Sequence, residues 1–268
     1  MITGADAEKM IESLDLRLFA HAPSQTSDYD RKALLAAQRV VRKLHGEYVY
    51  LEIGSHLGGT IQPHLVDPRC KRICSIDKRP REQPDDRGSR MEYLDNSSGR
   101  MLQILRDIAP DQVSKITCFD SDARDVKQSL ITPRPHLLFI DGEHTAHAAV
   151  ADFEFCLSVC APGAVICFHD AHIVHKGLKQ IRHSLVERKM KFESGILGLV
   201  YVIALDSGVF FEDECVRALT GSEFKFFFTS AARALVETHC GETARTILRP
   251  FAKMITKKEV WGATYAER

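Results

Sequence analysis

The stretch LEIGSHLGG, Leu51 to Gly59, leads from an apolar, strand-like run into a glycine-rich turn. Glycine lacks a Cβ, so a backbone that contains it can turn sharply and approach a ligand closely. The spacing Glu52-x-Gly54-x-x-x-Gly58 differs from the G-x-G-x-x-G pattern that cradles a dinucleotide pyrophosphate. The stretch therefore favours a cofactor without phosphates, and an ordinary strand-to-helix turn is the alternative.

Apolar runs rich in β-branched residues alternate with segments of helical period around this stretch. Such alternation is typical of a parallel sheet covered by helices. We predict an α/β fold, a Rossmann-like three-layer sandwich with a mostly parallel seven-stranded sheet. The strand candidates are Tyr48 to Ile53, Arg72 to Ile76, Lys115 to Phe119, His136 to Ile140, Ala164 to Phe168 and Gly198 to Leu205.

Helical spacing predicts two helices before the first strand, Ala5 to Leu18 and Asp28 to Leu44, joined by a polar linker. The charged stretch Arg79 to Arg90 contains two prolines and a glycine and is expected to be an exposed loop. The last sixty residues are expected to be mainly helical, although Phe224 to Phe228 could be a strand.

We divide the chain into three parts on this basis. Residues 1–46 are an N-terminal helical segment that could form a lid, residues 47–206 are the cofactor-binding domain, and residues 207–268 are a C-terminal extension. The extension could cover a substrate or mediate a homodimer.

The charge balance argues against polyanionic partners. The 268 residues include 36 Lys and Arg and 36 Asp and Glu, so no overall positive field would attract nucleic acid or an anionic membrane. The N-terminus lacks the features of a signal peptide, and the longest apolar run is too short to cross a bilayer. We expect a cytoplasmic protein with a small-molecule substrate, and neither nucleic acid nor a membrane as partner.

Acidic residues follow the second and third predicted strands. Asp77 lies 23 residues after Gly54, where a carboxylate can accept hydrogen bonds from both hydroxyls of a ribose. After the third strand, Asp122 could contact an adenine amino group while the small Ala123 leaves room for the ring. A helix N-cap formed by Ser121 or Asp122 is the alternative.

A second acidic group follows the next two strands. Asp141 and Asp170 end adjacent parallel strands, so both carboxylates should face the same crevice and could hold Mg²⁺. A bound cation would lower the pKa of a coordinated substrate hydroxyl. His144, with an ordinary imidazole pKa of ~6.5, could act as the base, and Glu143 could do so instead. In the alternative reading, these side chains cap helices or bond to backbone groups.

The ordered set of motifs resembles a known family. The glycine-rich motif, Asp77, Asp122-Ala123 and the stretch Phe139 to His144 together look like a class I S-adenosylmethionine-dependent methyltransferase. The stretch from Asp141 to Asp170 is similar to the branch that includes macrolide-sugar O-methyltransferases. The resemblance covers roughly residues 48–205 and makes residues 47–206 the expected methyltransferase domain.

The resemblance also implies roles for individual residues. The amino-acid half of the cofactor would be surrounded by Glu52, Gly54, Ser55 and Gly58, the ribose by Asp77, and the adenine by Asp122 and Ala123, with Asp141 also beside the cofactor.

Residues that match Asp141 and Asp170 are metal ligands in the sugar-methylating relatives, and the histidine that matches His144 is the base. This sequence has His169 where those relatives have a third acidic ligand. The set Asp141, His169 and Asp170 would favour a softer ion such as Mn²⁺, or the metal is absent.

The sequence thus predicts methyl transfer from S-adenosylmethionine to a hydroxyl of a sugar or natural product. His144 and Asp141 would be catalytic, and Mg²⁺ or Mn²⁺ would assist. A nicotinamide-dependent oxidoreductase is one alternative, disfavoured by the missing pyrophosphate glycines. A non-catalytic protein that binds the cofactor or a partner is the other. The acceptor is not determined by any motif, because fold and cofactor do not fix it.

Overall fold

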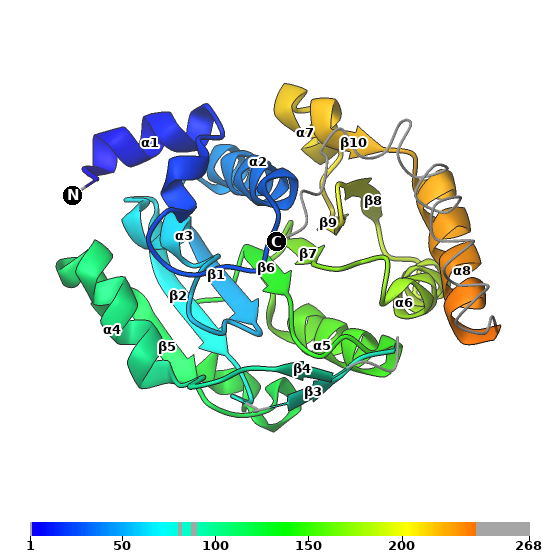
Figure 1. The fold of residues 1–268 in the computed structure, drawn as a ribbon. Helices are drawn as coiled ribbons and strands as arrows, with labels where there is room; N and C mark the ends of the chain where they lie inside the picture. The colour runs from blue at the N-terminus through cyan, green and yellow to red at the C-terminus, as the bar shows by residue number, and fades with distance from the viewer. Residues whose placement is uncertain (1, 80–81, 87–89, 240–268) are drawn as a thin grey trace.

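One eight-stranded sheet forms the centre of the computed structural model, which describes residues 2–79, 82–86 and 90–239. Its strands are β1 (Tyr48–Ile53), β2 (Cys70–Ile76), β5 (Ile116–Phe119), β6 (Leu137–Ile140), β7 (Val165–Phe168), β8 (Phe192–Leu197), β9 (Val200–Leu205) and β10 (Thr220–Gly221). Their order is β10-β8-β9-β7-β6-β1-β2-β5 (Figure 1). The five strands from β7 to β5 run parallel, whereas β9 is antiparallel to both β7 and β8.

The sheet confirms the predicted α/β fold with a mostly parallel arrangement. The five expected parallel strands are present, each shifted by at most two residues at its start. The strand expected from Gly198 is β9, which begins at Val200 and forms a hairpin with the preceding β8. The two-residue strand β10 pairs with β8 and adds an eighth strand to the expected seven.

Helices cover both faces of the sheet. They are α1 (Gly4–Glu12), α2 (Asp28–His45), α3 (Gln62–Val66), α4 (Ser98–Ile108), α5 (Ala146–Val159), α6 (His175–Glu187), α7 (Glu214–Leu219) and α8 (Glu223–His239). Short 3-10 helices are η1 (Leu16–Phe19), η2 (Pro110–Lys115), η3 (Ala123–Asp125), η4 (Gln128–Leu130) and η5 (Phe210–Glu212). No helix of the described residues has both the length and the apolar character that crossing a membrane requires.

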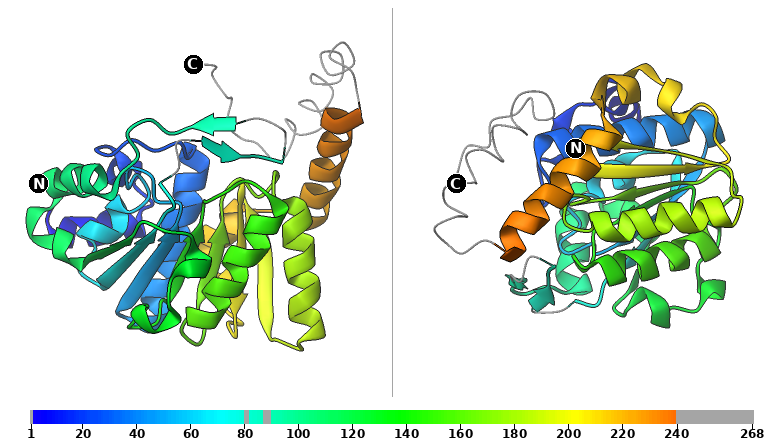
Figure 2. Two further views of the ribbon diagram at one scale, coloured as in Figure 1. Left: turned by 90° about the horizontal axis from the view of Figure 1, so that it is seen from below. Right: turned by 90° about the vertical axis from the view of Figure 1, so that its right-hand side faces the viewer.

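Two apolar cores lie on opposite sides of the sheet. One is formed with residues of α5, α6 and α8, and the other with residues of α2, α4 and α7. Figure 2 shows α5 and α6 side by side on one face and α2 on the other. The sheet is thus the middle of three layers, and its strand ends remain open at one edge.

Two local expectations differ from the structure, and a third, which left helix and strand open, is decided in favour of the helix. The helix expected over residues 5–18 is interrupted at Leu14, which has φ 53°, and Asp15 then caps η1. Residues 224–228 belong to α8 and are not a strand. The stretch Arg79 to Arg90, expected to be an exposed loop, instead carries a hairpin of β3 (Glu82–Pro84) and β4 (Arg90–Glu92) in its described part.

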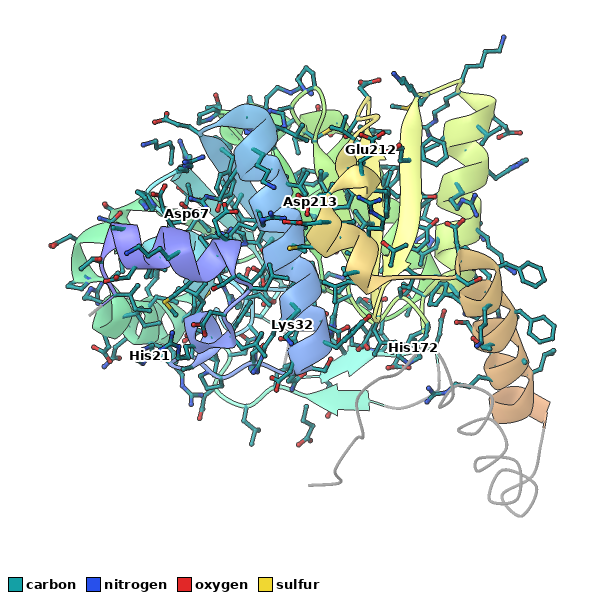
Figure 3. The ribbon with its side chains drawn as sticks, turned by 90° about the horizontal axis from the view of Figure 1, so that it is seen from above. His21, Lys32, Asp67, His172, Glu212 and Asp213 are labelled. Carbon is teal, nitrogen blue, oxygen red and sulfur yellow. The ribbon has the colours of Figure 1, made fainter. Side chains whose placement is uncertain are left out.

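The N-terminal helices are tied to the sheet domain by a buried ion pair. Arg42 of α2 has its Nε 3.2 Å from the Asp67 carboxylate, and the two side chains are 1% and 0% exposed. Figure 3 shows α1 and α2 next to each other, with Asp67 close to α1. The division of the chain at residues 46 and 206 stays a prediction, and residues 240–268 lie outside the described residues.

Replacing Asp67 with asparagine is expected to lower the free energy of unfolding by about 2 kcal/mol, because Arg42 loses its buried counter-charge and keeps only the half-exposed Glu8 and Glu12. Asp95→Asn is the control, since the Asp95–Arg100 pair is solvent-exposed and should contribute under ~1 kcal/mol. Urea unfolding measures both. Equal effects of the two changes would contradict a structural role for the buried pair.

Candidate functional site

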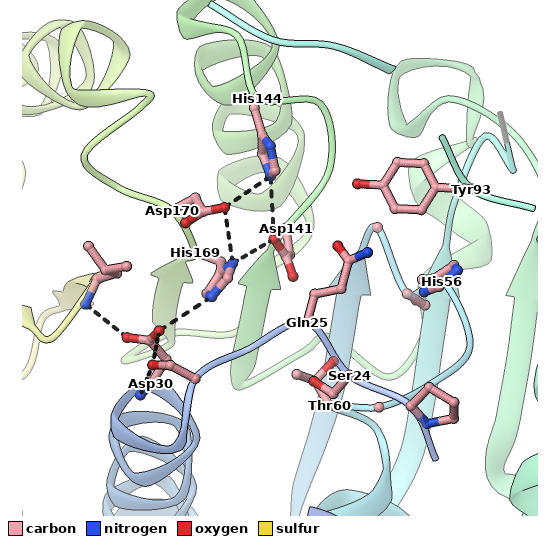
Figure 4. A pocket seen from close by; sticks show the side chains of 16 residues that line it. Ser24, Gln25, Asp30, His56, Thr60, Tyr93, Asp141, His144, His169 and Asp170 are labelled. Carbon is pink, nitrogen blue, oxygen red and sulfur yellow. Dashed lines mark hydrogen bonds and ion pairs between the residues drawn. The ribbon is translucent and has the colours of Figure 1, made fainter. Parts of the chain in front are cut away.

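Two hollows open at the carboxyl edge of the sheet and meet at Gly54. The first is lined by Pro23, Ser24, Gln25, Ser27, Asp30, Gly54, Ser55, His56, Gly59, Thr60, Tyr93, Asp141, His144, His169, Asp170 and Leu199 (Figure 4). The second is lined by Ile53, Gly54, Asp77, Lys78, Gln83, Ser121, Ala123, Gly142, Glu143 and Asp152. A single elongated ligand could therefore occupy both hollows by passing over Gly54.

The glycine turn is packed closely on two sides. Gly54 has φ 89°, and a Cβ there would lie 2.1 Å from the carbonyl oxygen of Asp141. A Cβ on Gly59 would lie 2.4 Å from the carbonyl oxygen of Pro23. The linker before α2 thus lies directly on the turn, where the side chain of Gln62 accepts hydrogen bonds from the backbone of His21 and Ala22. Glycine is required here because backbone from two other segments fills the space of a side chain.

Glu52 is buried beneath the turn. Its carboxylate accepts hydrogen bonds from Tyr50 Oη at 2.8 Å and from Thr60 Oγ1 at 2.5 Å. Burial raises the pKa of Glu52 to about 8. Among the residues described, neither Glu52 nor Gly58 lines a hollow, whereas Ser55 lines the first. Thr60, which donates to Glu52, lines the first hollow.

Asp77 lines the second hollow at the end of β2. Its two carboxylate oxygens accept hydrogen bonds from the backbone N–H groups of His56 and Arg79, each at 2.8 Å. The guanidinium of Arg79 lies 3.4 Å away and is 7% exposed. These contacts fix the carboxylate in position, and each oxygen keeps a further lone pair for a ligand hydroxyl.

Asp122 forms the helix N-cap that was the alternative to adenine binding. Its carboxylate accepts from the backbone of Arg124 at 2.9 Å and from the guanidinium of Arg124 in a two-bond pair, both at 2.8 Å. Lys78 lies 2.9 Å from its second oxygen. The Arg124 contacts lower the pKa of Asp122. Within the described residues, Ala123 lines the second hollow and Asp122 does not.

A cluster of carboxylates and imidazoles lines the first hollow at the ends of β6 and β7 (Figure 4). His169 Nδ1 lies 3.0 Å from Asp141 Oδ1 and 3.8 Å from Asp170 Oδ2. His144 Nε2 lies 3.7 Å from both carboxylates. The structure therefore brings together the four residues that the sequence placed near one another.

Mutual attraction shifts the pKa values in this cluster. Burial alone would lower the pKa of His169, but Asp141, Asp30 and Asp170 raise it well above its ordinary value. Burial likewise opposes protonation of His144, and Asp141 and Asp170 outweigh it, so its pKa is raised. Burial would raise the pKa of Asp141, yet the facing imidazoles lower it to about 2. The opposite charges in the cluster thus raise the pKa of both imidazoles and lower that of Asp141.

Asp30 at the start of α2 connects this cluster to the N-terminal segment. Its carboxylate lies 3.7 Å from His169 Nε2 and accepts hydrogen bonds from Ser27 Oγ at 2.6 Å and from the backbone of Leu199 at 2.9 Å. Asp30 is 1% exposed. The helical spacing of Asp28 to Leu44 contained no signal for a pair between Asp30 and His169.

Two further residues of the site come from the hairpin region: Asp85, inside the stretch that was expected to be an exposed loop, and Tyr93, just after it. Asp85 lies 3.6 Å from His144 Nδ1, and its side chain is 0% exposed. Tyr93 lines the first hollow and packs edge-on against His56 with ring centroids 5.2 Å apart. Burial and nearby carboxylates raise the pKa of Tyr93 to about 12.

The predicted metal ligands do not fit a metal site as they are arranged. His169 Nδ1 lies 3.0 Å from Asp141 Oδ1, and its Nε2 lies 3.7 Å from Asp30 on the other side, without a hydrogen bond. The residues that the structure describes contain no group of three or more His, Cys, Asp or Glu side chains arranged to hold an ion. Asp141 and Asp170 remain as two oxygen donors at the edge of the hollow.

One comparison with known proteins covers both the glycine turn and the acids at the strand ends. Residues 51–171 match a family model described as a methyltransferase domain. This match favours methyl transfer over the nicotinamide-dependent alternative. The comparison with curated proteins gives no match.

Similar solved structures include three O-methyltransferases. TomG from Streptomyces achromogenes, solved with SAM, is 16% identical, with 78% of this chain and 92% of TomG covered at a TM-score of 0.48. The O-methyltransferase from Bacillus cereus, solved with SAH, is 16% identical, with 74% and 90% covered at 0.47. CalS11, a TDP-rhamnose 3'-O-methyltransferase of calicheamicin biosynthesis, is 13% identical, with 75% and 94% covered at 0.48.

Proposed function

Residues 51–171 of this chain are a methyltransferase domain, and we propose that the enzyme transfers the methyl group of S-adenosylmethionine to a hydroxyl of a small molecule, such as a sugar or natural product. The single observation that carries the proposal is the pair of hollows joined at Gly54. One of them holds Asp77 and Ala123, and the other holds His144 beside two carboxylates.

The second hollow supports binding of the adenosine half. Asp77 offers fixed carboxylate oxygens to the ribose hydroxyls, and Ile53, Ala123 and Gly142 provide small walls for the flat base. The first hollow begins on the other side of Gly54 and contains Ser55 and Thr60 for the polar amino-acid half. S-Adenosylmethionine supplies an electrophilic methyl group, whose transfer to an oxygen leaves S-adenosylhomocysteine.

His144 supports the proposed role of general base. Its Nε2 faces the first hollow and would accept the proton that the acceptor hydroxyl loses as its oxygen bonds to the methyl group. Asp85 behind Nδ1 stabilises the imidazolium that forms and holds the ring in orientation. Asp141 faces the same nitrogen and adds to this stabilisation.

Metal assistance by Mg²⁺ or Mn²⁺ is the finer prediction from the sequence, and the position of His169 counts against it. Asp141 and Asp170 alone could hold a hard cation that keeps most of its water. His169, which would be the third ligand, already has its Nδ1 hydrogen-bonded to Asp141. The proposed mechanism therefore relies on the side chains of this cluster and contains no step through a cation.

The function is tested by transfer of a labelled methyl group to a panel of hydroxyl acceptors, before and after exhaustive chelation. We expect calorimetry to detect binding of S-adenosylhomocysteine and the fluorescence of NADH to stay unchanged. A methyl ether product should still form after chelation. Loss of product that Mg²⁺ or Mn²⁺ restores would instead support the metal prediction. Cofactor binding without product from any acceptor would support the non-catalytic alternative.

A further inference from the structure

Asp152 is a buried acid in the second hollow that the proposed mechanism does not use. It lies on α5, lines the hollow next to Gly142, and is 8% exposed. A Cβ on Gly142 would lie 3.3 Å from Asp152 Oδ2, so the glycine leaves this carboxyl uncovered. Among the described residues, the structure gives Asp152 no hydrogen bond or ion pair, although an unpaired buried carboxyl is costly.

The other acids around this hollow are already occupied. Glu143 accepts from Thr145 Oγ1 at 2.9 Å and lies 3.3 Å from Lys78. Asp122 is held by Arg124 and Lys78 and does not reach the hollow. Asp77 is fixed by backbone donors at the ribose side. Asp152 is thus the acid with free hydrogen-bonding capacity where the base would lie.

Adenine presents a complementary edge to such a group. Its 6-amino group donates a hydrogen bond and the adjacent N1 accepts one. A carboxyl group accepts from the amino group, and in its protonated form it also donates to N1. Burial and then the charge of Asp122 raise the pKa of Asp152 to about 7, with Lys78 and Arg124 opposing and Glu143 adding to the rise.

We propose that Asp152 binds the amino edge of the adenine ring, so that α5 and not Asp122 selects the nucleobase of the cofactor. The inference rests on the proposed function, because it assumes that the second hollow receives the adenosine half. It replaces the role that the sequence suggested for Asp122 with one for a residue thirty positions further along the chain.

The test compares calorimetric affinities for S-adenosylhomocysteine and for its purine analogue, which lacks the 6-amino group. Wild-type protein is expected to prefer the adenine compound by about tenfold, the effect of leaving one buried polar group unpaired. Asp152→Leu should lose the preference. Asp152→Asn should keep it, because an amide also offers a donor and an acceptor. Asp125→Asn, at a neighbouring exposed acid, is the control for charge.

Affinity as a function of pH gives a second readout. The protonated carboxyl is the form that donates to N1, so wild-type affinity for S-adenosylhomocysteine should fall as the pH rises through about 7. The charged groups that act on Asp152 are Asp122, Lys78, Arg124 and Glu143, and an asparagine in its place does not titrate. The Asp152→Asn variant should therefore lack this decline. Circular dichroism of each variant confirms folding, and the asparagine variant preserves the shape of the side chain.

Three results would overturn the inference. They are an unchanged preference in Asp152→Leu, loss of the preference in Asp122→Ala, and a decline of affinity with pH in Asp152→Asn that equals the decline of wild-type protein. Each leaves the proposed function standing, since wild-type protein would still bind S-adenosylhomocysteine. Absence of binding by wild-type protein overturns both.

Discussion

Replacing His144 with glutamine is expected to lower kcat by about 10²- to 10⁴-fold while affinity for S-adenosylhomocysteine changes little. Glutamine retains polarity and approximate size but cannot take up the acceptor proton. His147→Gln is the matched control, because His147 is exposed three residues further on. Single-turnover methyl transfer measures the chemical step. A loss under tenfold in His144→Gln, or an equal loss in His147→Gln, would remove His144 from the role of base.

The proposed role of His144 also predicts the direction in which the activity of the wild-type enzyme changes with pH. A base must be neutral to act, and the carboxylates around His144 raise its pKa above the ordinary ~6.5. kcat/KM should therefore rise with pH through a value above ~6.5. Asp170→Asn removes one of the facing carboxylates and should move this rise to lower pH. A profile that is flat from roughly pH 6 to 8 would contradict titration of this histidine.

Gly54→Ala is expected to have the largest effect on the fold. A Cβ at this position would lie 2.1 Å from one backbone oxygen and would sit at φ 89°, so β1 and β6 would have to separate. We expect a loss of about 3 kcal/mol or more in the free energy of unfolding, together with loss of cofactor binding.

Gly99→Ala on α4 is the control for this substitution. A Cβ there meets no atom within 4 Å, and alanine favours the helix by about 0.5–1 kcal/mol. Urea unfolding with calorimetry of S-adenosylhomocysteine measures both variants. If Gly54→Ala kept wild-type stability and affinity, the turn could not be the close-packed junction between the two hollows.

The sequence was sufficient for the five parallel strands and β9, although not for β8 and β10, and for the residues at the parallel strand ends. Parallel strands place their carboxyl ends at one edge, so Asp77, Asp141 and Asp170 could be placed together from strand position alone. The glycine spacing identified the turn for the same reason, because few backbone geometries join a buried strand to a helix. These inferences depend on periodicity, which is a local property of the chain.

Residues that depend on distant packing could not be placed in this way. Asp30 and Asp85 reach the cluster through tertiary contacts of an irregular linker and a short hairpin, and neither segment has a periodic pattern. The burial of Glu52 depends on Thr60 closing over it from eight residues away. The contact of Asp122 with Arg124 could be predicted from the local sequence, because the arginine lies only two positions later.

The N-terminal linker and the hairpin region have a consequence for how this protein could diversify. Neither segment belongs to the alternating strand and helix pattern. The linker nevertheless contributes Gln25 to the first hollow, and the hairpin region contributes Tyr93 (Figure 4). The sheet positions the residues of the proposed reaction. The linker and the hairpin region line the hollow in which we propose that the acceptor binds. Changes confined to Gln25 and Tyr93 could therefore alter the acceptor, whereas changes at Pro23, Asp30 or Asp85 would also disturb the glycine turn or the histidine cluster.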